Sequence, residues 1–467
     1  MIKLAKYLFI IIVYQICSFT TYADTHMSGG KTTNFVKNKN SYSLPARNLD
    51  KNLRINFLVG NSLFRRIWED AATSENIAKD GLGPFFSSTS CDGCHISDGR
   101  GHLPILEIDE DLISAVIQIG QPTKIENTNE KNHNDSTYGG QLSEFSTEDV
   151  LEEAQISIEY EFMNVAYDDG TIVQLKKPKV IIDKLNYGDL EPNTSSSIRI
   201  AQVMIGLGLI ENIAEEDILK LQDIDDSNSD GISGKANVTW DMQESKFKIG
   251  RFGWKASQPT VLQQTADAFY HDMGLSNKFY PNASNCTETQ LDCNNSVSGN
   301  SEIYDNFEVS NDQLDLVTFY SSQLGVPAAR NQKKADVIAG KKIFYEVGCN
   351  SCHVERHITR SDGPFENLNN QIISPYSDFL LHDMGDGLSD QVPEFQAEGN
   401  EWRTPPLWGI GLTKIVSGRE SYLHDGRAES LEEAILWHGG ESLESKNKFK
   451  NLDINQRNQL LKFISSL

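Results

Sequence analysis

Apolar residues recur at helical spacing in several parts of the chain. The spacing predicts amphipathic helices over 431–438 and 454–467. Residues 198–213 are apolar with two glycines that favour close packing, and 214–224 continue as a helix. A further helix is expected where one face would carry Leu53, Phe57, Leu63, Phe64, Ile67 and Trp68. These segments predict a mainly α protein.

One region follows the alternating pattern of strands instead. ISIEYEF at 156–162 and TIVQLKK at 171–177 flank a turn at Asp168, Asp169 and Gly170. Alternating runs on either side of a glycine-containing turn are typical of a β-hairpin. The sequence therefore adds one small β element to the helices.

The pentapeptide C-x-x-C-H occurs twice, as CDGCH at 91–95 and as CNSCH at 349–353. Two thiols at this spacing can bond to the vinyl groups of a haem, and the next histidine can ligate its iron. A redox dithiol, a structural disulfide or half of a zinc site would explain the cysteines, but none requires the histidine. We therefore predict two c-type haems, with attachment and ligation by Cys91, Cys94, His95, Cys349, Cys352 and His353.

Short segments around the two motifs repeat. GNSLF at 60–64 precedes the first motif and GKKIF at 340–344 precedes the second. The closing stretch LLKFISSL at 460–467 is similar to LVTFYSSQL at 316–324. Each copy thus has a leading helix, a haem motif and a closing amphipathic helix, so we expect two cytochrome-c-like domains.

The repeat places a domain boundary at the turn GVPAAR, residues 325–330. The first domain is predicted to span 51–325 and the second 331–467. Because the first is much longer, it must carry a large insertion that includes the hairpin.

The N-terminus has the features of an export signal. Lys3 and Lys6 precede a short apolar run, and small residues frame a cleavage site after residue 23. The signal peptide is predicted as 1–23. The apolar run is too short for a comfortable membrane span, and no later segment is long enough. We expect a periplasmic product without an integral membrane span, with a disordered lead-in over the polar residues 24–50.

The mature chain is strongly acidic. Net charge is −24 and becomes −26 when Lys3 and Lys6 leave with the signal. This charge argues against nucleic-acid binding, which needs basic surfaces. It suits a basic periplasmic redox partner such as a basic cytochrome, or serves solubility alone. Cys286 and Cys293 lie in a polar, helix-poor stretch. In an oxidising compartment they predict a local disulfide, with two free thiols as the alternative.

Further motifs follow one another over nearly the whole chain after about residue 50. They are YGGQL (138–142), DDSNSDGISGKAN (225–237), GRFGWKA (250–256), EWRTPPLWGIG (401–411) and LHDGRAESLEEAILWHGG (423–440). Together with the C-x-x-C-H motifs, they resemble the bacterial di-haem oxidoreductases, also called thiol oxidoreductases. That family is distantly similar to di-haem cytochrome c peroxidases and MauG-type enzymes. The resemblance implies two covalent haems, export and redox chemistry, with an unassigned substrate.

The sixth iron ligand differs between the two sites. His438 ends a predicted helix before Gly439 and Gly440, which allow backbone to approach a porphyrin, so we expect it to ligate the second haem. A structural histidine is the alternative. By the resemblance, His438 falls 14 residues after His424, at the place where di-haem peroxidases carry a methionine ligand. A bis-histidine haem would have the lower reduction potential.

For the first haem, His271, Met273 and His102 are the candidate sixth ligands. If none binds, the iron is five-coordinate and open to peroxide or another small oxidant.

Arginines and tryptophans in the glycine-rich motifs are further candidates. Arg100, Arg251 and Arg403 could pair with haem propionates or form ordinary salt bridges. Trp254 and Trp408 could carry electrons between the haems or only fill the core.

The segment DIDDSNSDGISG resembles half of an EF-hand loop. Asp226, Asn228 and Asp230 take positions 1, 3 and 5, and Gly231 makes the turn. Position 12 is Asn237 instead of glutamate, so the alternative to calcium is a turn held by its own side chains.

Two functions follow from these features. One is a peroxidase-like oxidoreductase, with the first haem as reactive site and the second as electron relay. Proton transfer would then need a side chain such as His102, His271, Glu107 or Glu144. The other is an electron-transfer cytochrome with both irons saturated. The enzyme is favoured, since a carrier would not need so large an insertion around the first haem.

Overall fold

A computed structural model of the chain describes residues 26–104, 112, 114–125, 128–282 and 284–467. The signal peptide predicted for 1–23 lies outside the described residues. In the described part, no helix is both long and apolar enough to cross a membrane.

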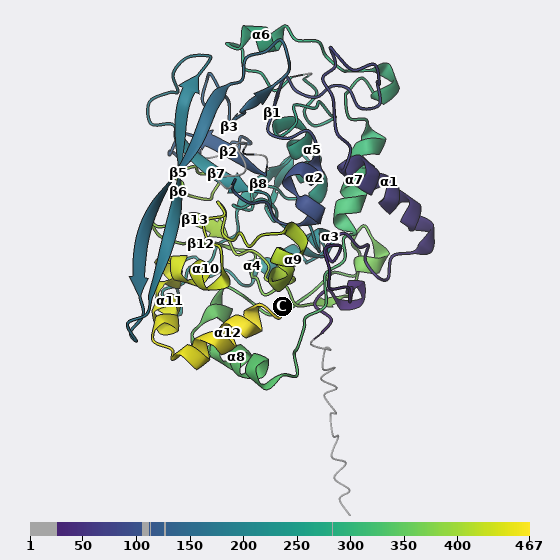
Figure 1. Cartoon of the computed structure of the whole chain (residues 1–467). Coiled ribbons are helices and arrows are strands. Elements are labelled where there is room, and N and C mark those ends of the chain that lie inside the picture. The colour runs from purple at the N-terminus through teal and green to yellow at the C-terminus, as the bar shows by residue number, and fades with distance from the viewer. Residues whose placement is uncertain (1–25, 105–111, 113, 126–127, 283) are drawn as a thin grey trace, which may run out of the picture.

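The α-helices of the described residues are short, and all but two of them lie after residue 206 (Figure 1). The α-helices are α1 Arg54–Phe64, α2 Cys91–Cys94, α3 Leu207–Glu211, α4 Glu215–Leu219, α5 Val261–His271, α6 Leu291–Asn294, α7 Asn311–Ser322, α8 Ala335–Glu346, α9 Thr413–Ser417, α10 Leu431–Trp437, α11 Leu443–Lys450 and α12 Ile454–Ile464.

The repeated segments form two equivalent helix pairs, α1 with α7 and α8 with α12. In each pair the glycine of the repeat lies at the crossing, where a β-carbon would overlap a carbonyl oxygen: that of Leu316 for Gly60, and that of Gln459 for Gly340. The rings that close the crossings are also matched, at 5.3 Å between centroids in both pairs: Phe64 with Tyr320 and Phe344 with Phe463. In the structure, Tyr320 takes the place that Phe463 has in the other pair. The aligned sequences match Phe463 with Phe319, which is one position earlier.

Gly340→Ala is expected to lower the free energy of unfolding by roughly 1–3 kcal/mol, because the added methyl group forces the two backbones apart. Gly387→Ala is the matched control. Gly387 is exposed, and a β-carbon there meets the Trp437 ring only at ordinary contact distance, 3.8 Å. Urea unfolding followed by circular dichroism measures both. Equal stability of the two variants would contradict the role given to this crossing.

Strands are more numerous than the sequence predicts. They are β1 Phe85–Phe86, β2 Ala115–Gly120, β3 Gln141–Leu142, β4 Phe145–Ser146, β5 Ala154–Ala166, β6 Ile172–Leu185, β7 Ser195–Ile200, β8 Val238–Asp241, β9 Lys246–Ile249, β10 His357–Ile358, β11 Ile372–Ile373, β12 Leu381–Asp383 and β13 Glu401–Arg403.

The expectation of a mainly α protein is therefore wrong. The structure is 28% helix and 19% strand, and the strands form several small antiparallel sheets: β3-β2-β7, β1-β4, β5-β6, β8-β9, β10-β11 and β12-β13. For example, residues 198–200 of the apolar stretch 198–213 belong to β7, and β7 pairs with β2 along its whole length. Strands of two to six residues are too short to show a clear alternation of apolar and polar residues, so the sequence pattern did not predict them.

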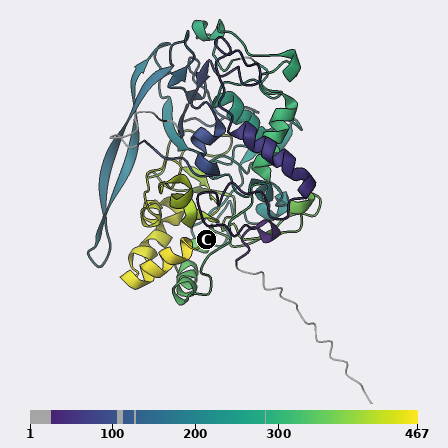
Figure 2. The same ribbon diagram turned by 45° about the vertical axis from the view of Figure 1, so that its right-hand side comes forward.

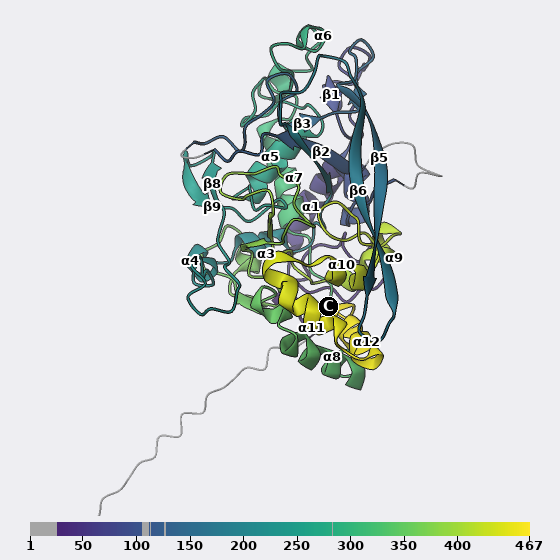
Figure 3. The ribbon, with the colours of Figure 1, turned by 90° about the vertical axis from the view of Figure 1, so that its left-hand side faces the viewer.

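The predicted β-hairpin is present and is longer than the segments that indicated it. Strands β5 and β6 run beside the C-terminal helices α10–α12 in all three views (Figures 1, 2 and 3). Near its turn, the hydroxyl of Tyr167 donates to Glu432 at 2.6 Å, and Arg457 of α12 pairs with Asp169 at 2.5 Å. The insertion of the first half thus packs against the second half.

The two halves also share a hydrophobic core. One buried cluster joins Ile117, Ile198 and Trp254 from the first half with Trp437 and Phe463 from the second. The predicted ranges 51–325 and 331–467 therefore do not have separate cores.

Residues 26–49, expected as part of a disordered lead-in over 24–50, are packed against the linker 325–330. Asn34 forms a β-bridge with Pro327, and Pro45 forms one with Leu324. Tyr42 is buried and donates its hydroxyl to the carbonyl of Gly409 at 2.7 Å. We call residues 26–49 the N-terminal strap. Its contacts with the linker and with Gly409 join residues far apart in the chain, so local composition did not reveal them.

Candidate functional site

The first C-x-x-C-H motif is a short helix that ends at its histidine. Helix α2 covers Cys91–Cys94, and the Ser90 hydroxyl accepts a hydrogen bond from the Gly93 amide at 3.1 Å. His95 follows, with its Nδ1 2.6 Å from the carbonyl oxygen of Gln202. Because a carbonyl only accepts, Nδ1 carries the proton and Nε2 keeps a lone pair for a metal.

The second motif repeats this arrangement on a 3₁₀ turn, η5, over Cys349–Ser351. The Nδ1 of His353 lies 2.9 Å from the carbonyl oxygen of Tyr376, which again leaves Nε2 for a metal. Burial lowers the pKa of His353 to about 4. His353 is therefore neutral at physiological pH, as a metal ligand must be.

Two further histidines occupy matching places at helix ends. His438 follows α10 and His271 ends α5. In each, Nδ1 donates to the carbonyl four residues earlier, that of Ala434 at 2.8 Å and that of Asp267 at 3.2 Å. Each helix therefore orients a histidine whose Nε2 is available.

The electrostatic surroundings of these two histidines differ. Burial lowers the pKa of His438. Burial acts in the same direction on His271, but the Asp267 carboxylate, 3.2 Å from Nδ1, outweighs it and raises the pKa of His271. Tyr280 donates its hydroxyl to the same carboxylate at 2.8 Å. His271 therefore holds a proton more tightly than a free imidazole.

A cavity of about 510 Å³ lies beside the first motif. Cys91, Cys94 and His95 line one part of it, and His271 and Met273 line another. His271, at the end of α5, and Met273, in the turn that follows, thus border the cavity beside Cys91 and Cys94.

Three buried arginines line the same cavity: Arg100, Arg251 and Arg403. In the part of the chain that the structure describes, none of them pairs with a carboxylate. Burial lowers the pKa of Arg251 to about 10, and burial with the charge of Arg100 does the same for Arg403. Buried cations without counter-ions are costly, so this wall is suited to an anionic group. Two thiols, an imidazole Nε2 and these cations fit a c-type haem with two propionates.

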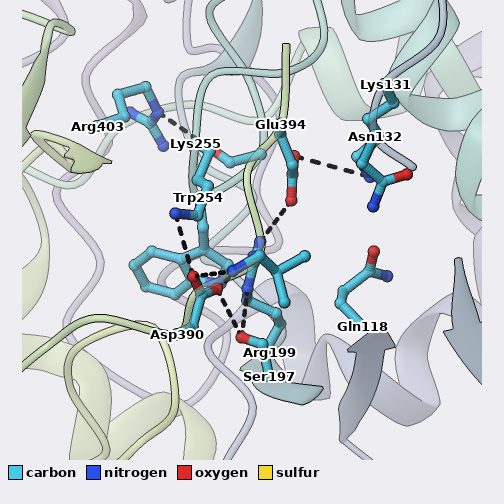
Figure 4. Close-up of polar contacts among 12 residues, drawn as sticks. Gln118, Lys131, Asn132, Ser197, Arg199, Trp254, Lys255, Asp390, Glu394 and Arg403 are labelled. Atoms are coloured by element: carbon cyan, nitrogen blue, oxygen red, sulfur yellow. Dashed lines mark hydrogen bonds and ion pairs between the residues drawn. The ribbon is translucent and has the colours of Figure 1, made fainter. Parts of the chain in front are cut away.

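A buried ion-pair network borders the cavity (Figure 4). Arg199 of β7 pairs with Asp390 at 2.6 Å and with Glu394 at 2.7 Å. Glu394 also lies 3.7 Å from Lys131, and Lys255 lies 3.2 Å from Asp390. Asp390 and Glu394 belong to the second half, so a loop of that half closes part of the first site. The sequence pattern did not single out these acids, because ion pairs between distant residues leave no local signal.

The remaining candidates for proton or electron transfer differ in whether they line the cavity. Trp254 lines the cavity and donates Nε1–H to the carbonyl of Ile200 at 2.9 Å. Trp408 is buried against Gly206, where it fills the core. His102 and Glu144 are not among the residues that line the cavity, and Glu107 lies outside the described residues.

The predicted calcium loop is closed by its own hydrogen bonds. The Asp226 carboxylate accepts from the Gly231 amide at 3.1 Å, and Asn228 accepts from the Asp230 amide at 2.8 Å. Calcium binding there stays a prediction. Elsewhere, Cys286 and Cys293 form a disulfide bond in the structure.

Comparison with protein families gives one match. The family model described as "di-haem oxidoreductase, putative peroxidase" matches residues 22–467. Searches of curated proteins and of solved structures find no match.

Proposed function

The chain belongs to the di-haem oxidoreductase family, and on this premise we propose that each C-x-x-C-H motif attaches one c-type haem covalently. Cys91 and Cys94 would hold the first haem, and Cys349 and Cys352 the second. Each bound haem would supply a redox-active iron, with His95 or His353 as its proximal ligand.

We propose that the protein is a peroxidase-like oxidoreductase whose first haem is the reactive site and whose second haem relays electrons. The observation that carries this proposal is the lining of the cavity beside the first motif, because His271, Asp267 and Tyr280 border the space that the first haem would occupy and can supply a proton there. At the second motif, the rings of His353 and His438 both have Nδ1 bound to a carbonyl, which leaves Nε2 of each for a metal. This supports bis-histidine ligation there, which closes the iron to substrate.

The chain itself can handle protons at the first site. His271, with its raised pKa, is held by Asp267, and both residues line the cavity together with Tyr280. Reduction of peroxide consumes protons, and a charged imidazole facing the cavity is suited to donate one. His271 can serve either as a proton donor or as an iron ligand, because its Nε2 cannot do both.

Electron paramagnetic resonance of the oxidised protein tests this division of roles. One high-spin and one low-spin ferric signal are expected, together with peroxide consumption in the presence of a reduced electron donor. Two low-spin signals without peroxide reactivity would favour the electron-transfer cytochrome instead.

His438→Ala is expected to convert the low-spin signal into a second high-spin signal while both haems stay attached. The control is His357→Ala, since His357 is another buried histidine of the second half and bonds the carbonyl of Ser377 at 2.7 Å. A low-spin signal that persists in His438→Ala would rule out His438 as the ligand.

We further propose that the protein acts in the periplasm with a basic redox partner. The signal-like N-terminus and the net charge of −24 support this setting. Calcium at Asp226, Asn228 and Asp230 is proposed on the sequence pattern alone.

A further inference from the structure

A buried histidine lies beside the thiol of the second motif. The Nδ1 of His382, on β12, is 3.7 Å from the Sγ of Cys352. The same ring bonds two carboxylates: Nδ1 lies 2.7 Å from Glu441, and Nε2 lies 2.9 Å from Asp378. We call His382, Asp378 and Glu441 the His382 triad.

The ring of His382 carries a positive charge. A carboxylate only accepts hydrogen bonds, so a ring with a carboxylate on each nitrogen must be protonated on both. The side chains of His382, Asp378 and Glu441 are only 4%, 3% and 11% exposed, which leaves little water to screen the charges.

The triad is fixed in place by the segments that hold the second haem site. Asp378 donates its backbone amide to the carbonyl of Cys352 at 2.9 Å. Glu441 comes three residues after His438 and also accepts from the Ser233 hydroxyl at 2.8 Å. At Gly234, a β-carbon would lie 2.9 Å from Cε1 of His382, so only glycine leaves room for the ring.

The first motif has a different charged group near its thiols. Burial and the Asp272 carboxylate raise the pKa of both Cys91 and Cys94, and Cys94 itself raises that of Cys91. A histidine cation bound to two carboxylates therefore lies against the second thiol pair, whereas a carboxylate without such a cation lies near the first.

We propose that His382, held by Asp378 and Glu441, is a positioning residue that sets the reduction potential of the haem attached at Cys352. A nearby positive charge favours the reduced iron, because reduction removes one positive charge from the haem. The imidazolium therefore raises the potential of the second haem relative to a neutral side chain at position 382, whereas its two carboxylates act in the opposite direction. This inference rests on the proposed attachment of a haem at the second motif.

Substitutions of His382 and of Glu441 are expected to shift the reduction potential of the second haem in opposite directions. His382→Gln removes the cation and lowers the potential of the second haem. Glu441→Gln removes an anion but keeps an acceptor for Nδ1–H, and raises that potential. Each change is expected to alter the reduction equilibrium at least tenfold, which is 59 mV for a one-electron couple. A role limited to packing would not produce opposite signs.

The experiment is a redox titration of the full protein, with each haem followed by its absorbance. Haem content is measured first, and Cys349→Ser/Cys352→Ser identifies which transition belongs to the second haem. His357→Asn is the matched control, since its ring bonds a backbone carbonyl instead of carboxylates and should shift neither transition.

Several results would overturn the inference. With two haems attached, shifts of the same sign, or none, would show that the triad does not set the potential. If the purified protein holds one haem and one tightly bound metal ion that His382→Gln releases, the site is a metal centre, because Cys352, Asp378 and His382 offer ligand atoms within 4.8 Å of one another. That result would also remove the premise of a second haem, whereas unshifted potentials with two haems would not.

Discussion

Replacing Cys91 and Cys94 together by serine is expected to lower the covalently bound haem from two per chain to one. Both thioether bonds at the first site require these thiols, and no other cysteine borders the cavity in the described chain. The measurement is haem per chain in denatured protein, where only covalent haem is retained.

The same variant is expected to be less stable than the protein with two haems. Without the haem, the cavity of about 510 Å³ stays unfilled and the charges of Arg100, Arg251 and Arg403 stay uncompensated. The matched control is Cys286→Ser/Cys293→Ser, which removes the disulfide pair and should leave both haems attached. Two covalent haems in the Cys91/Cys94 variant would refute the assignment of the first motif.

Arg199→Met is expected to lower the free energy of unfolding by about 3–5 kcal/mol, because removing one partner leaves buried charges uncompensated. The side chains of Asp390 and Glu394 are only 3% and 2% exposed and would face the new apolar side chain. Lys255 and Lys131 would remain at longer distances, 3.2 and 3.7 Å.

The effect of Arg199→Met should depend on pH. Burial alone would raise the pKa of Asp390, but Lys255 and Arg199 lower it to about 2. A depressed pKa contributes stability that is present above the ordinary value and is lost as pH falls toward 2. In the variant this pKa rises, so Asp390 takes up a proton sooner on acidification. The difference in stability should therefore be largest near neutral pH and shrink in acid.

Urea unfolding at several pH values measures this difference. Lys220→Met is the control, because Lys220 also pairs with an aspartate, Asp217 at 2.7 Å, but on the surface, where little change is expected. An equally small effect of Arg199→Met would show that the buried network does not hold the loop of the second half against the first site.

Local patterns predicted those parts of the fold that depend on local sequence. Helical periodicity indicated α1, α10 and α12, and alternation indicated the β5–β6 hairpin. The repeated segments at 60–64 and 340–344 indicated equivalent leading helices, and the structure shows that the glycine of each allows two helices to touch.

Long-range contacts account for what the sequence did not predict. The bridges of the N-terminal strap join residues almost 300 positions apart, such as Asn34 and Pro327. The pairing of Arg199 with Asp390 and Glu394 likewise joins distant segments. Neither contact leaves a periodic signal in either segment, so composition and spacing could not reveal them.

The residues of the candidate site likewise divide into those that local sequence patterns indicate and those that only long-range contacts bring together. The C-x-x-C-H motifs, His438 and the arginines of glycine-rich motifs were recognisable, because each depends on a few adjacent residues. The His382 triad was not, because Asp378 and His382 lie in a non-helical segment, where i,i+4 spacing predicts no contact. Its third member, Glu441, comes close only through the fold.

The contacts of the N-terminal strap limit when this part of the chain can fold. Residues 26–49 are synthesised before their partners, which include residues 324–330 and Gly409. The strap must therefore stay open until the second half of the chain is available. Closing it joins residues 26–49 to the linker and to the second half, so these contacts cannot form while the second half is missing.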